Sequence, residues 1–544
     1  MEPEQPPHQD SEMADADMQV EGNFDNEDEY DNTPAFVGEG DAVEVQVDDD
    51  NAPMEDDYDD DAQDDGGDDI EEEIVDMAKV VIPSHSDPVY AIGCTLNTAV
   101  ANNTSNNSNQ ALLRIVSGGG DDKAFWHEVA LSSSPAAAAN TTDQFQFQVQ
   151  TWPLEHLHTF KDSVSAIADN SPFIAFDATK PPNPEWMAVG ALDGSIVLYG
   201  PNNNNQVQLL EGPTSDIEFL CWHPKGGNVV LAGSSDATLW MYHTSLKKCL
   251  QVFVGHEDSV TCGCFSADGK VAVSGSADGT VRIWAPKTGK SKHVFRFDNT
   301  NSAGGGPPPA LTCMVTHGGP DRQLIMVGSE DGQAHICHIA NKKHVASLRH
   351  YDPTANAINN NNNNIPPQGN GEEDDDEEEE VFLPSGVEAV GFCKSNPHWC
   401  ATGGMDGVLK IWDLANQGQV RHTCQAAAAD ADAGNSSSSS RNNGAGNGIT
   451  KLEWHPTLPL VITSNCRGRI HLWDARNGQL LETLTGHRDV INDMGVVFVP
   501  SASAQPTAAA GHALIVTGSD DHTVRVFDLD IDAALAKAPQ QILA

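Results

Sequence analysis

An eleven-residue pattern recurs eight times along this 544-residue chain, and it limits the fold more than any other feature of the sequence. The clearest copy reads SGSADGTVRIW and spans residues 274–284. Its alternating residues Val281 and Ile283 predict a strand with one inward face, and Asp278-Gly279 predicts a tight turn between two strands. The eight copies occupy residues 117–127, 189–199, 232–242, 274–284, 327–337, 402–412, 463–473 and 517–527.

The spacing of the copies predicts the architecture. Their ends lie 72, 43, 42, 53, 75, 61 and 54 residues apart. The shortest spacings match the period of a WD repeat, about 40–45 residues, in which four strands form one propeller blade. Longer spacings contain low-complexity insertions, which a rigid scaffold tolerates because long loops add little closure entropy. We therefore predict an all-β, eight-bladed WD-repeat β-propeller over residues 77–529. The predicted insertions are residues 97–110, 131–144, 299–309, 353–380, 425–448 and 500–512.

The two ends of the repeat array predict how the ring closes. Residues 79–82 (KVVI) precede His85 just as residues 481–484 precede His487, so an outer strand is expected before the first copy. After Phe527 only an Ala-rich C-terminal tail, residues 530–544, follows. We predict that the N-terminal strand completes the eighth blade, which joins the two ends and removes an open sheet edge.

Most of the charge lies outside the repeats. The chain has 80 acidic and 29 basic side chains, for a net charge of -51. Residues 1–78 hold 32 of the acids and no Lys or Arg, and residues 372–380 hold nine more. Such self-repelling tracts have too few apolar residues to offset the entropy of ordering, so residues 1–76 are predicted to be a disordered acidic tail. This tail either keeps the chain soluble or attracts and shields a basic partner.

Composition also excludes several classes of protein. Lys and Arg are few and form no basic stripe along the sequence, so no direct nucleic-acid binding is expected. No run of about 18 apolar residues predicts a membrane span, and no secretory signal is visible. The eleven cysteines never form a CxxC pair, which favours reduced thiols in a cytosolic or nuclear protein. Cytoplasmic localisation is favoured because no basic cluster of the nuclear-localisation type is present, and nuclear entry stays open.

The fourth copy carries a polar cluster that imitates a catalytic triad. His256, Ser274, Asp278 and Trp284 stand where WD repeats place a buried hydrogen-bond relay. The Trp at its end and the Asp in a turn suit a structural role better than activation of a nucleophile. Two thiols in the CGC segment, residues 262–264, do not make a tetrahedral metal site. No enzyme, metal or cofactor is therefore predicted.

Two other copies carry altered relays. The eighth has His487, Thr517 and Asp521, but Phe527 replaces the Trp. In the seventh copy, Arg467 stands in the place of the Asp, so its relay is expected to be broken. Both blades are predicted to be looser than the fourth.

An aspartate precedes the first strand of five blades, at the expected top rim of the propeller. A ring of such carboxylates would attract Lys and Arg of an extended basic segment. Asp in this turn also caps local backbone N–H groups, and the two roles are compatible. The five rim residues are Asp87, Asp162, Asp216, Asp258 and Asp489.

Several segments go beyond a generic WD repeat. They include GGDDKAFW at 119–126, DSVSA at 162–166, WHP at 222–224, VEAVGFC at 387–393 and WDARNG at 473–478. With the acidic tail, they make residues 76–529 similar to the angio-associated migratory cell protein family. The resemblance implies a propeller fold. It also implies a function, because the fungal relative of this family acts as a dedicated chaperone of one basic large-subunit ribosomal protein.

These observations predict a non-enzymatic escort that acts as a monomer. Its acidic rim would bind the basic tail of a newly made large-subunit ribosomal protein and prevent aggregation and stray RNA binding. A runner-up is a WD-repeat adaptor in signalling, cell migration or cytoskeletal regulation, which would use hydrophobic contacts of the top face. Escort of histones, another basic client, stays open.

Overall fold

The structure is a computed structural model of the whole chain. Residues 1–73, which make up nearly all of the predicted acidic tail, and most residues of the predicted insertions lie outside the described part. The described residues are 74–97, 110–133, 145–154, 158–169, 186–200, 207–225, 228–297, 307–317, 323–351, 385–426, 447–499 and 511–537.

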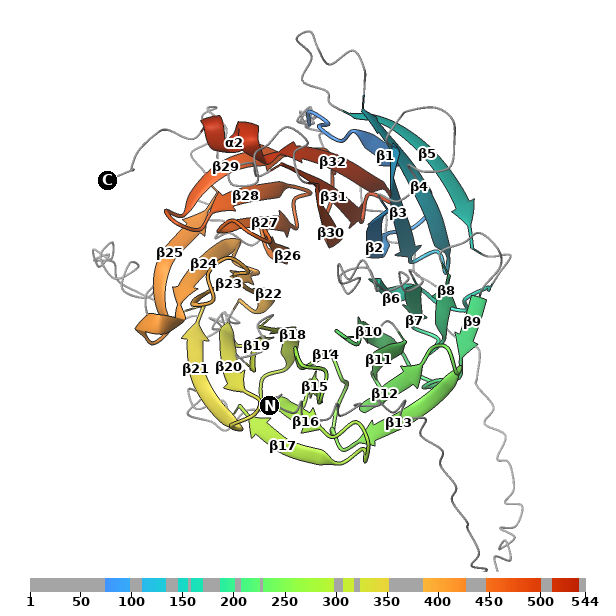
Figure 1. Cartoon of the computed structure of the whole chain (residues 1–544), viewed down its shortest axis with the longest axis vertical. Helices are drawn as coiled ribbons and strands as arrows, with labels where there is room; N and C mark the ends of the chain where they lie inside the picture. The colour runs from blue at the N-terminus through green and yellow to red at the C-terminus, as the bar shows by residue number, and fades with distance from the viewer. Residues whose placement is uncertain are drawn as a thin grey trace, which may run out of the picture. The chain divides into compact units, whose positions relative to one another are not determined.

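Eight four-stranded antiparallel sheets form a closed ring, which confirms the predicted eight-bladed propeller (Figure 1). Blades 1 to 4 each take four consecutive strands. Blade 1 is β2 (Val89–Asn97), β3 (Gln110–Gly119), β4 (Ala124–Ser133) and β5 (Phe145–Pro153). Blade 2 is β6 (Val164–Asp169), β7 (Met187–Ala191), β8 (Ile196–Tyr199) and β9 (Val207–Leu210). Blade 3 is β10 (Ile217–Trp222), β11 (Val229–Ser234), β12 (Thr238–His243) and β13 (Lys248–Val254). Blade 4 is β14 (Cys262–Phe265), β15 (Ala272–Gly275), β16 (Thr280–Trp284) and β17 (Ser291–Arg296).

Blades 5 to 7 repeat this order, and blade 8 takes its outer strand from the other end of the chain. Blade 5 is β18 (Leu311–Thr316), β19 (Leu324–Ser329), β20 (Gln333–His338) and β21 (Lys343–Arg349). Blade 6 is β22 (Val387–Phe392), β23 (Trp399–Gly404), β24 (Val408–Asp413) and β25 (Gln419–Gln425), with a 3-10 turn, η3 (Leu414–Asn416). Blade 7 is β26 (Ile449–Trp454), β27 (Leu460–Asn465), β28 (Ile470–Asp474) and β29 (Gln479–Leu484). Blade 8 is β30 (Ile491–Val499), β31 (His512–Ser519), β32 (Val524–Asp530) and β1 (Val80–Ile82).

The core lies between neighbouring blades, because the middle strands of each blade are covered on both faces. In blade 4, all four residues of β15 are buried, whereas the outer strand β17 starts with two exposed residues. One core cluster joins Val80 and Leu514 of blade 8 to Leu113 of blade 1. Burying side chains of this kind stabilises the fold by about 1.5–3 kcal/mol each, so blade-to-blade packing supplies much of the stability.

The N-terminal strand closes the ring as predicted. β1 pairs antiparallel with β32, with Val80 opposite Val526 and Ile82 opposite Val524. Three residues that the sequence assigned to the acidic tail, residues 74–76, are described and reach blade 8, where the Thr485 hydroxyl donates to the Val75 carbonyl at 2.6 Å. The described part of the chain therefore begins at residue 74, inside the predicted tail.

The predicted C-terminal tail contains a helix. β32 extends to Asp530, and α2 (Ile531–Lys537) follows directly. Ile531 and Ala534 are buried and Leu535 is partly buried, a spacing that gives a short helix one apolar face against blades 7 and 8.

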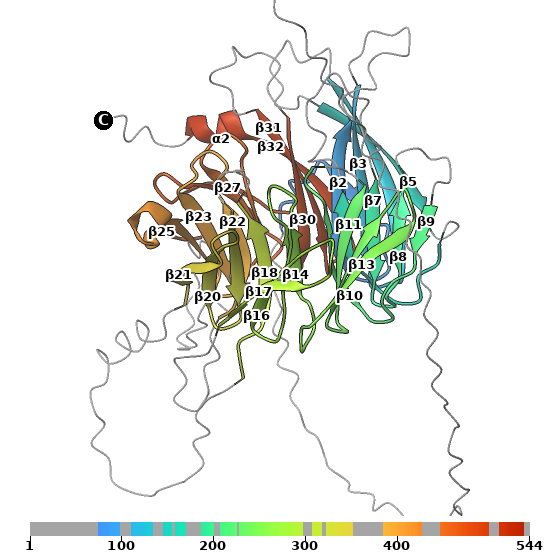
Figure 2. The same cartoon turned by 60° about the horizontal axis from the view of Figure 1, so that its bottom comes forward.

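The turns gather on two faces of the ring, because successive strands of a blade run in opposite directions along its short axis (Figure 2). The turn between the second and third strands shares one face with the connection into the next blade. We call this face the top. The turn between the third and fourth strands therefore lies on the opposite, bottom face.

Candidate functional site on the top face

The predicted relay of blade 4 is present and complete. His256 Nδ1 lies 2.9 Å from Asp278 Oδ2, and its Nε2 lies 2.7 Å from Ser274 Oγ. The Trp284 indole donates to the same Oγ at 2.8 Å. Burial raises the pKa of Asp278, but hydrogen bonds from His256, Thr280 and the Glu257 N–H outweigh it and hold that pKa well below its usual range. The carboxylate is thus fixed in a turn, where it joins the top connection to its own blade.

A second complete relay lies in blade 6, where sequence reasoning missed it. His350 contacts Thr402 Oγ1 at 2.7 Å and Asp406 Oδ1 at 3.2 Å, and the Trp412 indole donates to Thr402 at 2.8 Å. The sequence signal was the His-Tyr-Asp triplet at 350–352, which an insertion separates from its partners by 52 residues.

Blade 1 carries a third relay, with a second histidine in the place of the Trp. His85 contacts Asp121 Oδ1 and Ser117 Oγ, each at 2.8 Å. Ser117 Oγ lies 2.9 Å from His127 Nε2, which occupies the position of the indole nitrogen in blade 4. Burial lowers the pKa of His127 to about 3 and also lowers that of His85, so both rings are neutral near pH 7.

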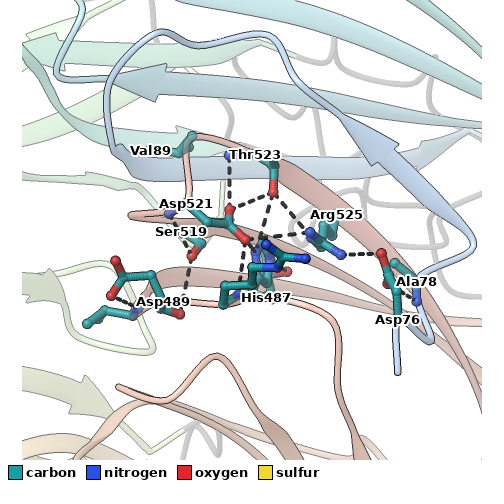
Figure 3. Close-up of polar contacts among 12 residues, drawn as sticks. Asp76, Ala78, Val89, His487, Asp489, Ser519, Asp521, Thr523 and Arg525 are labelled. Carbon is teal, nitrogen blue, oxygen red and sulfur yellow. Dashed lines mark hydrogen bonds and ion pairs between the residues drawn. The ribbon is translucent and has the colours of Figure 1, made fainter. Parts of the chain in front are cut away.

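The relay of blade 8 ends differently, as predicted from Phe527. His487 contacts Asp521 and Thr517 at 2.8 Å each, and no indole follows. Arg525 instead donates to Thr523 at 3.2 Å and pairs with both Asp521 and Asp76 (Figure 3). These bonds tie the segment before β1 to the relay, so Arg525 compensates for the missing Trp. Whether blade 8 is looser than blade 4 stays a prediction.

Blade 7 has no acidic residue at the relay position, as predicted from Arg467. The Asn465 side chain takes over the turn by accepting the N–H groups of Arg467 and Arg469 at 3.1 and 2.9 Å. Only the last bond of the relay persists, from the Trp473 indole to Thr463 at 3.0 Å.

The described ranges contain neither a candidate metal site nor a candidate membrane-spanning helix. Within residues 74–537, gaps excepted, no group of three or more His, Cys, Asp or Glu could hold a metal ion. No helix in that part of the chain is long and apolar enough to cross a membrane.

Four of the five predicted rim aspartates occupy one equivalent place on the top face. Asp87, Asp162, Asp258 and Asp489 are exposed, and each stands two residues before the first buried residue of its inner strand or of the turn entering it. Three of them cap the turn as expected. The backbone N–H of the next residue donates to Oδ1 of Asp162, Asp258 and Asp489 at 2.7–2.8 Å. One carboxylate oxygen is thus used locally, and the charge still faces solvent.

The fifth rim residue, Asp216, is shifted by one position. Ser215 stands in the place of Asp258, because both backbone carbonyls accept the hydroxyl of the serine in the following turn. Asp216 is partly buried and adjoins Glu218, a residue that sequence reasoning did not select. Burial raises the pKa of Glu218, a hydrogen bond from Ser259 opposes the rise, and Asp216 adds to it. The border of blades 3 and 4 therefore carries Asp216 and Glu218 beside Asp258.

Glu218 breaks a pattern that links neighbouring inner strands. In four blades the residue after the first buried residue of the inner strand, or of the turn entering it, donates through its side chain to the carbonyl that begins the next blade's inner strand. Glu218 in blade 3 and Glu388 in blade 6 hold this place with a carboxylate, which adds negative charge at the mouth of the ring. Burial and the neighbouring Glu330 raise the pKa of Glu388. The four links are Ser165 to Ile217, Thr261 to Leu311, Thr312 to Val387 and Asn492 to Val89.

Basic residues interrupt the rim. Lys161 precedes Asp162 and Arg488 precedes Asp489, and both cations are exposed, whereas Glu257 precedes Asp258. A neighbouring cation therefore partly offsets the rim carboxylate in blades 2 and 8, whereas a neighbouring acid adds to it in blade 4.

Comparison with known proteins identifies the repeat and its relatives. The family model "WD domain, G-beta repeat" matches residues 204–243, 247–285, 384–413 and 478–528. Angio-associated migratory cell protein of Pongo abelii is 32% identical over 341 residues, which cover 63% of this chain. The protein of the same name from Homo sapiens is 31% identical over the same length. The chain spans 64% of the length of these relatives.

Solved structures with the same architecture include two of the fungal protein Sqt1. Sqt1 of Saccharomyces cerevisiae superimposes with a TM-score of 0.56 at 15% identity, covering 84% of this chain and 100% of the other. Sqt1 of Chaetomium thermophilum, bound to the N-terminus of the ribosomal protein L10, gives a TM-score of 0.52 at 18% identity with the same coverage. At these identities the likeness concerns the fold.

Proposed function

We propose that this chain, a WD-repeat β-propeller similar in sequence to the angio-associated migratory cell proteins, is a non-enzymatic scaffold that escorts a basic large-subunit ribosomal protein during ribosome assembly. The client would be held by an extended basic segment across the top face. Masking that segment would keep the newly made protein from aggregating and from binding RNA before delivery.

The observation that carries the proposal is the shared turn position of four exposed carboxylates. Asp489, Asp87 and Asp162 lie on three consecutive blades, because ring closure places blade 8 beside blade 1. Asp258 adds a fourth charge next to Glu218. An extended segment that crosses the ring mouth would meet carboxylates along its path, and charge-assisted contacts of this kind favour Lys and Arg.

The solved relatives support the choice of client. A structural neighbour of this chain has been solved with the N-terminus of ribosomal protein L10 bound to it. The relays support a scaffold as well. In blades 4, 6 and 8 the relay histidine contacts a serine or threonine hydroxyl that is buried inside its own blade, so this hydroxyl does not face the rim as a nucleophile would.

The proposal is tested by separating the charge of the rim from its capping role. In an Asp162→Asn/Asp258→Asn variant, the side-chain oxygen still caps the turn while the charge is removed. We expect this variant to fold normally and to bind a peptide of the L10 N-terminus more weakly, by about 1–3 kcal/mol for each partly desolvated contact. Calorimetric titration of the full chain in 50 and 300 mM salt measures the change, and binding of the unaltered chain should weaken with salt.

Two double variants with reversed charge and a comparison with a histone-tail peptide complete the experiment. Asp162→Lys/Asp258→Lys should abolish peptide binding, whereas Asp268→Lys/Glu453→Lys, which makes the same charge change away from the rim, should not. Unchanged affinity in the rim variants would remove the rim from the mechanism. Tighter binding of a histone-tail peptide than of the L10 peptide would assign the rim to a different basic client.

The adaptor function remains the second candidate because two large apolar side chains are exposed on the top face. Tyr90 of blade 1 is 42% exposed and Met405 of blade 6 is 40% exposed. A partner held by these residues would bind with little dependence on salt. Loss of binding in Tyr90→Ala/Met405→Ala, with normal binding in the rim variants, would favour the adaptor.

A further inference from the structure

Seven lysines gather on the outer bottom edge of blades 3, 4 and 5. They come from three separate stretches of sequence, residues 243–254, 284–297 and 337–350, and none of these stretches contains an Asp or Glu. Each stretch covers the bottom turn before the outer strand and the outer strand itself. The lysine edge consists of Lys247, Lys248, Lys287, Lys290, Lys292, Lys342 and Lys343.

The repeat places three of these lysines at one structural position. Lys248 and Lys343 each begin an outer strand and pair with the last residue of the preceding strand. Lys290 holds the same place in blade 4, where its carbonyl accepts the Ala285 N–H. In blades 6 and 7 the equivalent residues are Gln419 and Gln479. Figure 1 shows the outer strands β13, β17 and β21 following one another along one side of the ring, so the charges form an arc.

Contacts between neighbouring blades make the arc continuous. The Lys342 ammonium of blade 5 donates to the Lys292 carbonyl of blade 4 at 3.1 Å. A Cβ added to Gly289, in the bottom turn of blade 4, would lie 2.3 Å from Gln251 of the outer strand of blade 3. The three lysine groups therefore belong to one surface.

These lysines lack partners of opposite charge. All seven are exposed, and none forms an ion pair with a carboxylate in the described part of the chain. Elsewhere in the same ring exposed lysines do find acids, as Lys394 does with Glu453 and Lys537 with Glu482. In a chain with 80 acidic residues, seven unpaired cations side by side form a positive surface that attracts an external polyanion.

Backbone geometry adds a second, independent observation. Lys247 and Lys342 adopt a left-handed conformation with φ of 52°, at the turn position where blades 4 and 7 have Gly289 and Gly478. This conformation strains residues other than glycine. A lysine is thus present twice at a site where the backbone favours glycine, which points to a use for the side chain.

Protection of an open sheet edge is the alternative explanation, because lysines on edge strands discourage edge-to-edge pairing. The other outer strands argue against it. β25 has one cation, Arg421, and the outer strands β5 and β9 of blades 1 and 2 have none. Edge protection would act on all blades, whereas the lysine edge is confined to three.

We propose that the lysine edge binds the phosphodiester backbone of a nucleic acid. The sequence alone predicted no such partner, because the lysines are about one blade period apart along the chain and align only in the ring. An acidic protein segment would have to compete with the chain's own acidic tracts, which are present at a high effective concentration. A phosphate backbone has the advantage that binding releases its condensed counterions, which favours it over a carboxylate tract. The proposal is independent of the escort function, which uses the opposite face.

The test measures binding of labelled 20-nucleotide RNA and DNA duplexes to the full chain by fluorescence anisotropy between 50 and 200 mM salt. Lys248→Gln/Lys290→Gln/Lys343→Gln gives blades 3 to 5 the residue of blades 6 and 7. We expect at least about tenfold weaker binding at 50 mM salt and a salt dependence of log K that is shallower by about 2–3. The matched control, Lys270→Gln/Lys394→Gln/Lys537→Gln, removes the same charge elsewhere and should bind within about twofold of the unaltered chain.

The outcomes separate the sources of the ligand. Equal loss with both duplexes, or loss with RNA alone, supports the proposal, and the second result identifies RNA as the source. The proposal is overturned if the unaltered chain binds neither duplex at 50 mM salt, if the two triple variants bind alike, or if a polyglutamate peptide binds the lysine edge more tightly than both duplexes. Binding of the L10 peptide, measured in the same variants, should be unchanged, so failure here leaves the escort function untouched.

Discussion

Blades 4 and 5 are neighbours with the same strand order, yet they fill the space beneath their top turns with opposite chemistry. Blade 4 has the polar chain His256–Ser274–Trp284. In blade 5, Phe297 holds the place of the histidine, since its N–H bonds to the glycine carbonyl of the preceding turn, as the N–H of the relay histidine of blade 6 does. Phe297 stacks on His335 with ring centroids 4.0 Å apart and planes 3° from parallel.

The difference shows that the relay is one solution to a packing problem and not a condition for forming a blade. Val327 and Cys337 of blade 5 stand where blade 4 has Ser274 and Trp284, and both are fully buried. The strand order of the two blades is the same. Strand pairing and turn geometry therefore specify the blade, and the space beneath the top turn can hold either a hydrogen-bonded relay or a largely apolar group of side chains.

The largest effect is expected from mixing the two solutions in blade 4. Ser274→Val gives blade 4 the valine that blade 5 has at this place. It leaves the Trp284 N–H and one ring nitrogen of His256 without hydrogen-bond partners. Each unsatisfied buried group costs about 1–3 kcal/mol, so we expect the free energy of unfolding to fall by about 3 kcal/mol. Urea unfolding followed by tryptophan fluorescence measures the loss.

The reciprocal change in blade 5 serves as the control. Val327→Ser places a hydroxyl in blade 5, where Phe297 and Cys337 replace the histidine and the Trp of the relay, so it should destabilise by about 2 kcal/mol and should not create a relay. If either substitution were neutral, the buried sets of the two blades would be interchangeable and the comparison would fail.

The sequence predicted the blades better than the relays because the two depend on different distances along the chain. Turn and strand signals are local, so the eight copies and the closing strand β1 were visible. The relay histidine of blade 4 lies 18 residues before its serine. That of blade 8 lies 30 residues before its threonine, but its segment GHRD at 486–489 repeats GHED at 255–258, so this relay was visible. The histidines of blades 1 and 6 follow Ser84 and Arg349 in the place of that glycine, and they lie 32 and 52 residues before their hydroxyl partners, across insertions. The one-residue shift of Asp216 and the alignment of the lysine edge arise only once the ring is built.

The relays of blades 1 and 4 can be compared through the pH dependence of stability. His127 stands in the place of Trp284 and can titrate, whereas the indole cannot. Burial holds its folded-state pKa at about 3, below the unfolded value of 6.5, so the unfolded chain binds the proton first on acidification. The contribution of neutral His127 to the free energy of unfolding is therefore fully present above about pH 6.5. Below that pH it falls by up to about 1.4 kcal/mol per pH unit.

His127→Gln should make that slope shallower by about 1.4 kcal/mol per pH unit between pH 6 and 4.5, or about 2 kcal/mol over the window. Denaturant unfolding at several pH values measures it. The window avoids the relay carboxylates, because Asp278 and Asp521 have depressed pKa values and lose their contribution only at lower pH. His335 and His471, with pKa values lowered to about 4 by burial, contribute equally in both proteins. An unchanged slope would show that His127 is protonated in the folded chain or accessible to solvent.

The top turns give the smallest expected effect. The residue after the turn aspartate, or after Arg467 in blade 7, is left-handed in all eight blades, and Gly279 holds this place in blade 4 with φ of 69°. Blade 3 has Ala237 at the same place with φ of 65°. Asp and His tolerate this region better than Ala, so Asp122 and His522 in blades 1 and 8 are less strained.

Ala237→Gly should therefore stabilise the protein, the reverse of what glycine does in a strand. Relief of left-handed strain is about 1–2 kcal/mol, and the added freedom of the unfolded chain offsets about 0.5–1 kcal/mol of it. We expect a net gain of about 0.5–1 kcal/mol, seen as a higher Tm. Gly279→Ala in blade 4 should do the opposite and by more, because its new Cβ would also lie 2.4 Å from Pro308 Cβ. A loss of stability in Ala237→Gly would mean that the alanine methyl makes packing contacts worth more than the strain it causes.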